Sequence, residues 1–78
     1  MKYQVKFSNM EEILEFVKIA SKLPEDIDIV EGNITIDAKS ILGLLSCCRF
    51  GENMLLKIHG KQPEDMAKRI QNFIVAEA

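Results

Sequence analysis

The sequence has few of the residues from which metal sites and disulfide frameworks are built. It contains one histidine and two cysteines among 78 residues, and the cysteines, Cys47 and Cys48, are adjacent. Adjacent cysteines rarely close an unstrained disulfide, which argues against a secreted, disulfide-stapled fold. No other histidine and no suitably spaced cysteine accompanies His59, so the sequence predicts neither a metal site nor a cofactor, and we expect His59 to be an ordinary solvated residue.

An excess of basic charge is also absent. Lysine and arginine together number 10 against 12 aspartate and glutamate residues, which gives a net charge of −2 and argues against a general nucleic-acid binder. The N-terminal stretch M-K-Y-Q-V-K-F alternates polar and apolar residues, whereas a signal peptide has an apolar run of about 7 to 15 residues. We therefore expect a cytoplasmic protein without a membrane anchor, with one globular domain over residues 1–78.

Catalytic motifs are missing as well. Gly43 and Gly51 belong to no nucleotide-binding glycine pattern. Glu11 and Glu12 are adjacent in the first turn of a predicted helix, where the helix dipole favours carboxylates without any acid–base role. The cysteines lack the C-x-x-C spacing of catalytic dithiols, so we expect buried or half-buried thiols, and a reactive thiol is a weaker alternative. The sequence therefore predicts a protein that is not an enzyme.

The first third of the chain predicts a strand and then a helix. Apolar side chains alternate with polar ones through residues 3–7, as in a strand with one buried face. Ser8 or Asn9 can cap the following helix, because each is followed three residues later by a glutamate, the capping-box spacing. The helix ends before Pro24. Its expected core stripe is Met10, Ile13, Leu14, Val17 and Ala20.

The rest of the chain predicts two more helices and three strands. Alternation over residues 27–29 and 34–36, with turn residues between them, indicates a hairpin. A short helix over about residues 40–48 precedes a strand over 54–58, and Pro63 suits the start of a last helix whose core stripe would be Met66, Ile70, Phe73 and Ile74. The order β-α-β-β-α-β-α predicts an α+β fold, with a four-stranded, mostly antiparallel sheet carrying three helices on one face.

The stretch D-A-K-S-I-L-G-L-L-S, residues 37 to 46, has more apolar residues than one core-facing stripe needs. Ser40 suits the N-cap of this helix, a role worth about 0.5 to 2 kcal/mol. If Leu44 and Cys47 face the core, helical spacing turns three other side chains partly outward: Ile41, Leu42 and Leu45. Such an exposed apolar cluster predicts a protein-binding surface, although deeper burial of the helix or self-association would also explain it.

Three segments give the chain a resemblance to a known family. The segments are V-K-I-A-S-K-L-P-E-D-I-D-I (17 to 29), D-A-K-S-I-L-G-L-L-S (37 to 46) and the strand and helix start of residues 51 to 65. Together with the order of elements they resemble HPr, the histidine-containing phosphocarrier of the bacterial sugar phosphotransferase system. K-S-I-L-G-L-L-S is similar to the run around the regulatory serine in HPr proteins of Gram-positive bacteria. The resemblance implies that Ser40 is a site for HPr kinase, and it places the partner-binding patch at Ile41, Leu42 and Leu45.

The chain departs from that family at its active-site loop. HPr proteins carry G-[IL]-H-[AT]-R-P-A between the first strand and helix, and the histidine relays a phosphoryl group. Here the strand runs into the helix as F-S-N-M-E-E-I, which places Asn9 at the histidine position and Glu11 at the arginine position. An asparagine amide is no nucleophile toward phosphorus, and a carboxylate would repel the phosphate. We therefore expect that this chain cannot relay phosphoryl groups through histidine.

The resemblance and the departure together lead to two functional hypotheses. The first is a regulatory HPr-like protein of carbon catabolite control, phosphorylated at Ser40 by an HPr kinase and docking on a transcription regulator. The second is a constitutive interaction or assembly module in which Ser40 is a plain helix cap. In neither hypothesis does the protein bind nucleic acid directly, and the sequence leaves its oligomeric state open.

Overall fold

The computed structural model describes all residues, 1–78, and contains five strands and four helical segments. α1, the longest helix, has 11 residues, and no helix in the structure is long and apolar enough to cross a membrane. The elements follow in the order β1 (Lys2–Val5), α1 (Met10–Ala20), β2 (Ile27–Glu31), β3 (Ile34–Asp37), α2 (Ile41–Cys47), β4 (Met54–Ile58), α3 (Pro63–Arg69), a 3-10 turn (Gln71–Phe73) and β5 (Ile74–Glu77).

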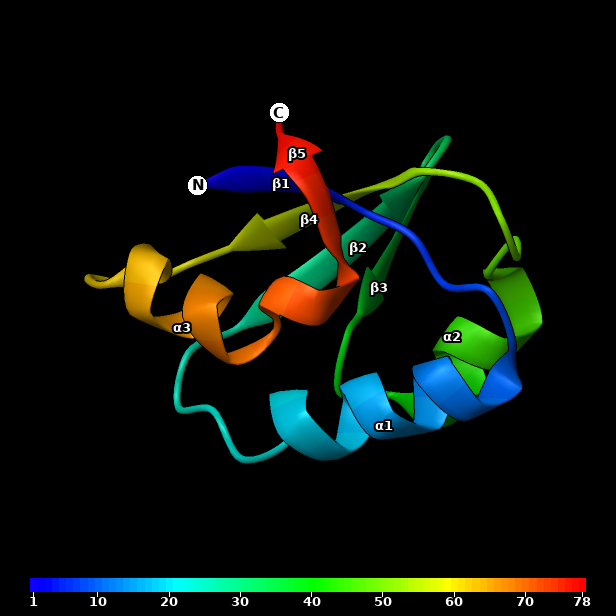
Figure 1. Cartoon of the computed structure of the whole chain (residues 1–78), viewed down its shortest axis with the longest axis horizontal. Helices are drawn as coiled ribbons and strands as arrows, with labels where there is room; N and C mark the ends of the chain where they lie inside the picture. The colour runs from blue at the N-terminus through cyan, green and yellow to red at the C-terminus, as the bar shows by residue number, and fades with distance from the viewer.

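The strands form one antiparallel sheet, with the helices packed on one side of it (Figure 1). The strand order is β3-β2-β4-β1-β5, and every neighbouring pair is antiparallel. The predicted hairpin is present, since Glu31 pairs with Ile34 across a turn of two residues. Gly32 has φ +59° in that turn, a backbone angle that glycine adopts without strain. The α+β class, the antiparallel sheet and the helices on one face are confirmed.

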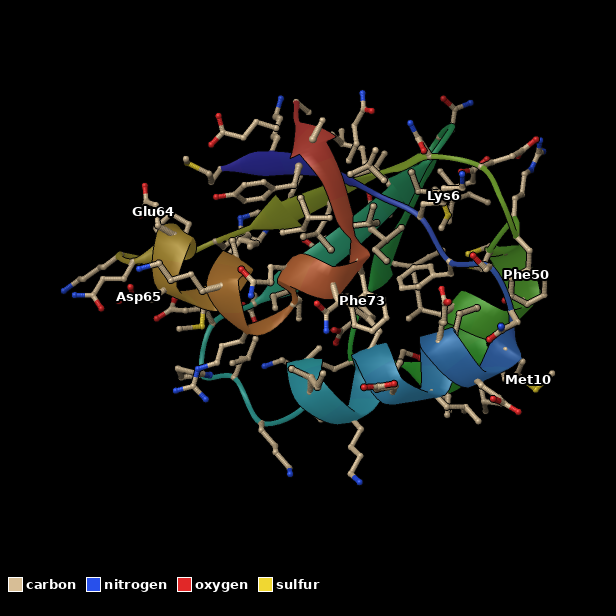
Figure 2. All side chains as sticks on the ribbon, viewed as in Figure 1. Lys6, Met10, Phe50, Glu64, Asp65 and Phe73 are labelled. Carbon is tan, nitrogen blue, oxygen red and sulfur yellow. The ribbon has the colours of Figure 1, made fainter.

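The core lies between the sheet and the helices and contains no charged side chain. Phe7, Phe16 and Phe73 form its aromatic centre, with ring centroids 5.0 to 5.6 Å apart and tilted or edge-to-face. Such rings bury a large apolar area, and their packing adds about 0.5 to 1.5 kcal/mol per pair. Phe73 projects from the C-terminal segment toward α1 (Figure 2). The aromatic centre therefore joins the two ends of the chain.

The prediction of four strands and of a helix running to Ile74 is wrong. α3 ends at Arg69, and after the 3-10 turn the chain becomes a fifth strand that pairs with β1. Ile74 and Val75 are β-branched and favour a strand, and β1 would otherwise leave a row of unpaired backbone groups at the sheet edge. Ile70 and Phe73 are nevertheless buried as expected, because the turn presents them to the same core.

The predicted core stripe of α1 is also partly wrong. Ile13, Val17 and Ala20 are buried, but Met10 and Leu14 are 53% and 41% exposed. Phe16, which the stripe omitted, is fully buried and faces the core in their place. The helix is therefore rotated from the predicted orientation, so that two large apolar side chains face solvent.

Candidate functional site

Ser40 is the N-cap of α2, as the sequence predicts. Its backbone is extended (φ −96°, ψ 104°), and its Oγ accepts a hydrogen bond from the backbone N–H of Gly43 at 3.3 Å. A Cβ atom on Gly43 would lie 2.9 Å from Cγ2 of Ile36 on β3. The absence of a side chain at Gly43 thus lets α2 approach the sheet closely. Ser40 lies at the N-terminus of the same helix.

The segment leading to Ser40 is held by several hydrogen bonds. The N–H groups of Lys39 and Ser40 donate to the side chain and carbonyl of Asp37, each at 2.9 Å. Ala38 is fully buried, and its N–H donates to the carbonyl of Ile27 at 2.8 Å. Nζ of Lys39 donates to the carbonyl of Leu23 at 2.8 Å. The exposed hydroxyl of Ser40 therefore stands at the end of a fixed segment.

The apolar residues of α2 divide between core and solvent as predicted. Leu44 is fully buried, whereas Ile41, Leu42 and Leu45 are 38%, 78% and 37% exposed. The expected outward orientation of these three side chains is thereby confirmed. Their role in binding a partner stays a prediction.

Three further large apolar side chains are exposed on α1 and in the turn after α2, and the sequence prediction missed them as surface residues. Met10 and Leu14 lie on α1, which packs against α2, and Phe50, in the turn after α2, is 50% exposed. The N–H of Gly51 donates to the carbonyl of Phe7 at 2.8 Å, which holds this turn beside the segment that enters α1. Figure 2 shows Met10 and Phe50 at the same end of the molecule. We call the combined set the α1–α2 surface: Met10, Leu14, Ile41, Leu42, Leu45 and Phe50.

No strong sequence signal marks these additional residues. The spacing of Met10 and Leu14 fits a core stripe as well as it fits a surface, and only the burial of Phe16 decides between the two. Phe50 stands in a turn between Arg49 and Gly51, outside every helix and strand that the sequence predicts. An isolated aromatic residue in a turn is the one hint the sequence offers.

Asn9 and Glu11 lie at the start of α1. Oδ1 of Asn9 accepts a hydrogen bond from the N–H of Glu12 at 3.0 Å, and Oε1 of Glu12 accepts one from the N–H of Ser8 at 2.9 Å. Asn9 is thus the N-cap, and Ser8 precedes it. Glu11 is exposed and forms no ion pair. Asn9 is engaged in capping, and Glu11 adds negative charge beside it.

Cys47 and Cys48 are free thiols, both partly buried at the end of α2. Burial, and secondarily the charges of Cys47 and Glu31, raises the pKa of Cys48 to about 11. Burial and the Glu31 carboxylate also raise the pKa of Cys47. Sγ of Cys48 lies 3.7 Å from Sδ of Met54 in the core. A thiolate is the reactive form, so raised pKa values favour unreactive, structural thiols.

His59 follows β4 and is exposed, as expected for a solvated residue. Its Nε2 lies 2.8 Å from Oδ2 of Asp28 on the neighbouring strand. Asp26 and Asp37 border the same open depression. No group of three or more histidine, cysteine, aspartate or glutamate side chains is arranged to hold a metal ion. We therefore assign His59 a local role, a hydrogen bond between neighbouring strands to Asp28.

Solved structures share this architecture. The HPr-C-His structure from Thermoanaerobacter tengcongensis matches with a TM-score of 0.75 and 25% identity, over 92% of this chain and 85% of that one. The phosphocarrier protein HPr from Bacillus anthracis strain Ames matches with a TM-score of 0.77 and 22% identity, over 95% of both chains. The catabolite repression containing protein Crh of Bacillus subtilis, an intertwined, swapped dimer, matches with a TM-score of 0.67 and 20% identity, over 87% and 84% of the two chains.

The sequence itself also matches a family model. No curated protein is a significant match. The model described as PTS HPr component phosphorylation site, however, matches residues 12–76, which include Ser40 and all of α2. Because that match spans most of the chain and agrees with the fold, the chain belongs to the HPr family of the sugar phosphotransferase system.

Proposed function

We propose that this chain is a regulatory HPr-family protein of the phosphotransferase system that does not relay phosphoryl groups through histidine. In this proposal Ser40 is the phosphorylated residue, and Ile41, Leu42 and Leu45 contact the protein partner. The protein has no catalytic activity of its own and acts in the cytoplasm. The observation that carries the proposal is the exposed hydroxyl of Ser40 beside exposed apolar side chains, in a chain of this family that lacks the loop histidine.

The start of α1 supports the loss of the relay. Asn9, which stands where the family has its histidine, is the cap of α1, and Glu11 stands where the family has an arginine. The family match begins at residue 12, so both positions lie outside it. The only histidine, His59, lies beyond β4 and next to Asp28. A phosphoryl relay needs a nucleophile and a cation to neutralise the phosphate, and this helix start offers neither.

The surroundings of Ser40 support phosphorylation at that residue. A kinase would transfer the γ-phosphoryl group of ATP to Oγ, breaking the bond to ADP while the hydroxyl proton leaves to a base of the kinase. Phosphoserine carries about −1.5 to −2 charges at neutral pH. No acidic side chain lies in the first turn of α2 to repel it. The added charge would lie next to Ile41 and Leu42, where it would change what can dock.

The partners follow from this arrangement. An HPr kinase would recognise the exposed segment around Ser40, and a transcription regulator would read the phosphorylated surface. The fold neighbour Crh of Bacillus subtilis is described as a catabolite repression containing protein, which supports a regulatory role for a protein of this shape. The dimer of that neighbour makes the oligomeric state of this chain a quantity to measure alongside partner binding.

Two labelling reactions test the proposal. With an HPr kinase and ATP, peptide mass mapping should place one phosphate on Ser40, and the S40A variant should take up none. With phosphoenolpyruvate and the general enzymes of the sugar transport system, the protein should remain unlabelled, and an authentic HPr in the same reaction is the positive control. Label from phosphoenolpyruvate on any side chain would refute the loss of the relay, and a failure of the kinase to modify Ser40 would refute the regulatory site.

One observation favours a second candidate function. The Ser40 hydroxyl already accepts a hydrogen bond from Gly43, so a capping role accounts for the serine without any kinase. In that case the chain is a constitutive interaction module. S40A would then retain full partner binding in cells, whereas the first proposal requires partner binding to depend on phosphate at this residue.

A further inference from the structure

A small hollow lies between α3 and the C-terminal segment, and Figure 1 shows α3 at the opposite end of the molecule from α2. It forms where the chain turns after α3 and pairs with β1 as β5, and its volume is about 290 Å³. Ligand pockets usually measure about 300 to 1,000 Å³, so this hollow suits a small molecule. We call it the α3–β5 groove, and the residues that border it include Tyr3, Glu64, Lys68, Gln71, Ile74 and Glu77.

The floor of the groove contains a tyrosine hydroxyl without a partner. Tyr3 is only 5% exposed, and Ala67 and Ile74 supply further apolar surface beside it. The Tyr3 hydroxyl takes part in none of the side-chain hydrogen bonds of the protein, although a buried tyrosine hydroxyl usually has a partner. Every fully buried side-chain polar atom is paired, so this hydroxyl is open to solvent, and its opening is the groove.

The rim of the groove carries charges of both signs. Glu64 and Lys68 on α3 and Glu77 on β5 are exposed, and none of them forms an ion pair. Glu64 and Lys68 have the four-residue spacing of a helical ion pair, yet they do not pair with each other. Burial, and secondarily the carboxylates of Glu77 and Glu64, raises the pKa of Tyr3. Both carboxylates therefore lie near the hydroxyl, which keeps its proton at neutral pH.

These groups match a ligand that carries both charges. A primary ammonium has three N–H donors and no acceptor, and the hydroxyl of Tyr3 and the carboxylates of Glu64 and Glu77 are oxygen acceptors around one place. Lys68 would repel a ligand with an ammonium alone, and the two glutamates would repel a ligand with a carboxylate alone. A molecule with an ammonium and a carboxylate close together satisfies both signs.

We propose that the α3–β5 groove binds a free α-amino acid with a short aliphatic side chain. The ammonium of the amino acid donates to the two glutamates and to the tyrosine hydroxyl, and its carboxylate accepts from Lys68. Its aliphatic side chain lies on the apolar floor of the groove. The site requires neither phosphorylation of Ser40 nor a protein partner, so it is a binding function separate from the proposed one.

Three small probes test this inference. L-valine carries both charged groups, isobutylamine is the same molecule without the carboxylate, and isovalerate is the same molecule without the ammonium. Each is titrated at neutral pH into the ¹⁵N-labelled protein, without a tag because the C-terminus adjoins Glu77. L-valine should shift amide signals of β1, α3 and β5 and should bind at least about threefold more tightly than either other probe. Added salt should weaken its binding.

Variants of the rim and floor assign the contacts. E64Q/E77Q should weaken the binding of L-valine at least about threefold, and it should not weaken the binding of isovalerate. K68Q should remove the preference for L-valine over isobutylamine, because the partner of the carboxylate is lost. Y3F keeps the ring and removes only the hydroxyl, and it should weaken the binding of L-valine about threefold.

Matched controls change the same charges elsewhere. Lys6 and Met10, the first residue of α1, lie away from Glu64 (Figure 2). E11Q/E15Q, on α1, removes two carboxylates as E64Q/E77Q does, and K6Q removes one lysine as K68Q does. Both controls should bind L-valine like the wild type, and amide spectra would verify that every variant is folded.

The inference is overturned if L-valine does not bind, if it binds no more tightly than the other two probes, or if its shifts map away from β1, α3 and β5. It is also overturned if E64Q/E77Q binds L-valine as E11Q/E15Q does. These outcomes are separate from the kinase reaction. A protein that is phosphorylated on Ser40 but does not bind L-valine keeps the proposed function and loses this inference.

Discussion

The side-chain ammonium of Lys39 donates a hydrogen bond to the backbone carbonyl of Leu23 at 2.8 Å, which ties the chain after α1 to the residue before Ser40. Leu23 lies beyond Ala20, the last residue of α1, so its carbonyl has no partner in the helix, and the Lys39 ammonium supplies the donor. The two residues are 16 positions apart, so this contact fixes α1 and the start of α2 relative to each other. The orientation of the proposed binding surface depends on that relationship.

We expect K39M to destabilise the protein. The substitution keeps most of the apolar stem but removes the donor to Leu23, and a hydrogen bond from a charged group contributes about 1.5 to 3 kcal/mol where it is partly buried. Urea unfolding followed by circular dichroism should show a lower midpoint with an unchanged slope. K22M, at an exposed lysine without such a contact, is the control and should lie within about 0.5 kcal/mol of wild type. Equal effects of the two variants would contradict the proposed tie.

Two serines, Ser40 at the N-cap of α2 and Ser46 within the helix, differ in what their hydroxyls do. Oγ of Ser40 accepts from the N–H of Gly43, whereas Oγ of Ser46 donates to the carbonyl of Gly43 within the helix, at 2.9 Å. S40A should therefore cost about 0.5 to 2 kcal/mol, and S40D should retain much of that stability because aspartate is also a good cap. S46A should change the free energy of unfolding by no more than about 0.5 kcal/mol. Thermal melts of the three variants check this order, and a larger loss for S46A than for S40A would count against the cap.

We expect that glycine is required at position 43 because α2 packs closely against β3 there. Alanine is normally better than glycine inside a helix by about 1 kcal/mol. Here the new Cβ would meet Cγ2 of Ile36 at 2.9 Å, so G43A should be destabilising in spite of that preference. In an I36A background the closest contact is removed, and only Oγ of Ser40, at 3.1 Å, remains tight, so the same substitution should be clearly less destabilising. A double-mutant cycle measures this difference, and the prediction fails if G43A has the same effect in both backgrounds.

The buried thiol makes stability depend on alkaline pH. The pKa of Cys48 is raised to about 11 in the folded state from an ordinary value of 9.0, chiefly by burial. Below the ordinary value both states hold the proton and the stabilisation is fully present. Between the two values the unfolded chain releases its proton first, so the free energy of unfolding should fall as the pH rises. C48S removes this titration, and its unfolding midpoint should decline less steeply from pH 8.5 to 11. Parallel curves would contradict the raised pKa.

The features that could be predicted from the sequence are those set by local pattern. Asn9 and Ser40 cap their helices because a short polar side chain before a helix can accept a hydrogen bond from a free N–H of the first turn. For Asn9, the glutamate three residues later also supports the prediction. The prediction that Leu42 and Leu45 are exposed if Leu44 faces the core is confirmed, because one buried position determines which side of a short helix faces solvent. The resemblance to HPr added the family, which α+β patterning alone could not give.

The features that could not be predicted depend on tertiary pairing. The segment from Ile74 has helical spacing to Ile70, but β1 supplies an edge to which it pairs as a strand. The helical spacing of five apolar residues predicts Met10 and Leu14 in the core. In the structure Phe16 faces the core, and the helix is rotated so that Met10 and Leu14 are exposed. The exposure of Met10 and Leu14 depends on this rotation of α1, which the local sequence pattern does not determine.

The pairing of β5 with β1 brings the two ends of the chain together. The N–H of Ala78 donates to the carbonyl of Lys2 at 3.1 Å, and Figure 1 shows both termini at the strand side, away from α1 and α2. An affinity tag, fluorophore or surface tether attached at either end would therefore leave the helical side open to free solution. A short linker between the ends would also allow a circular permutant to be opened in a distant loop, which makes this scaffold convenient for immobilised interaction measurements.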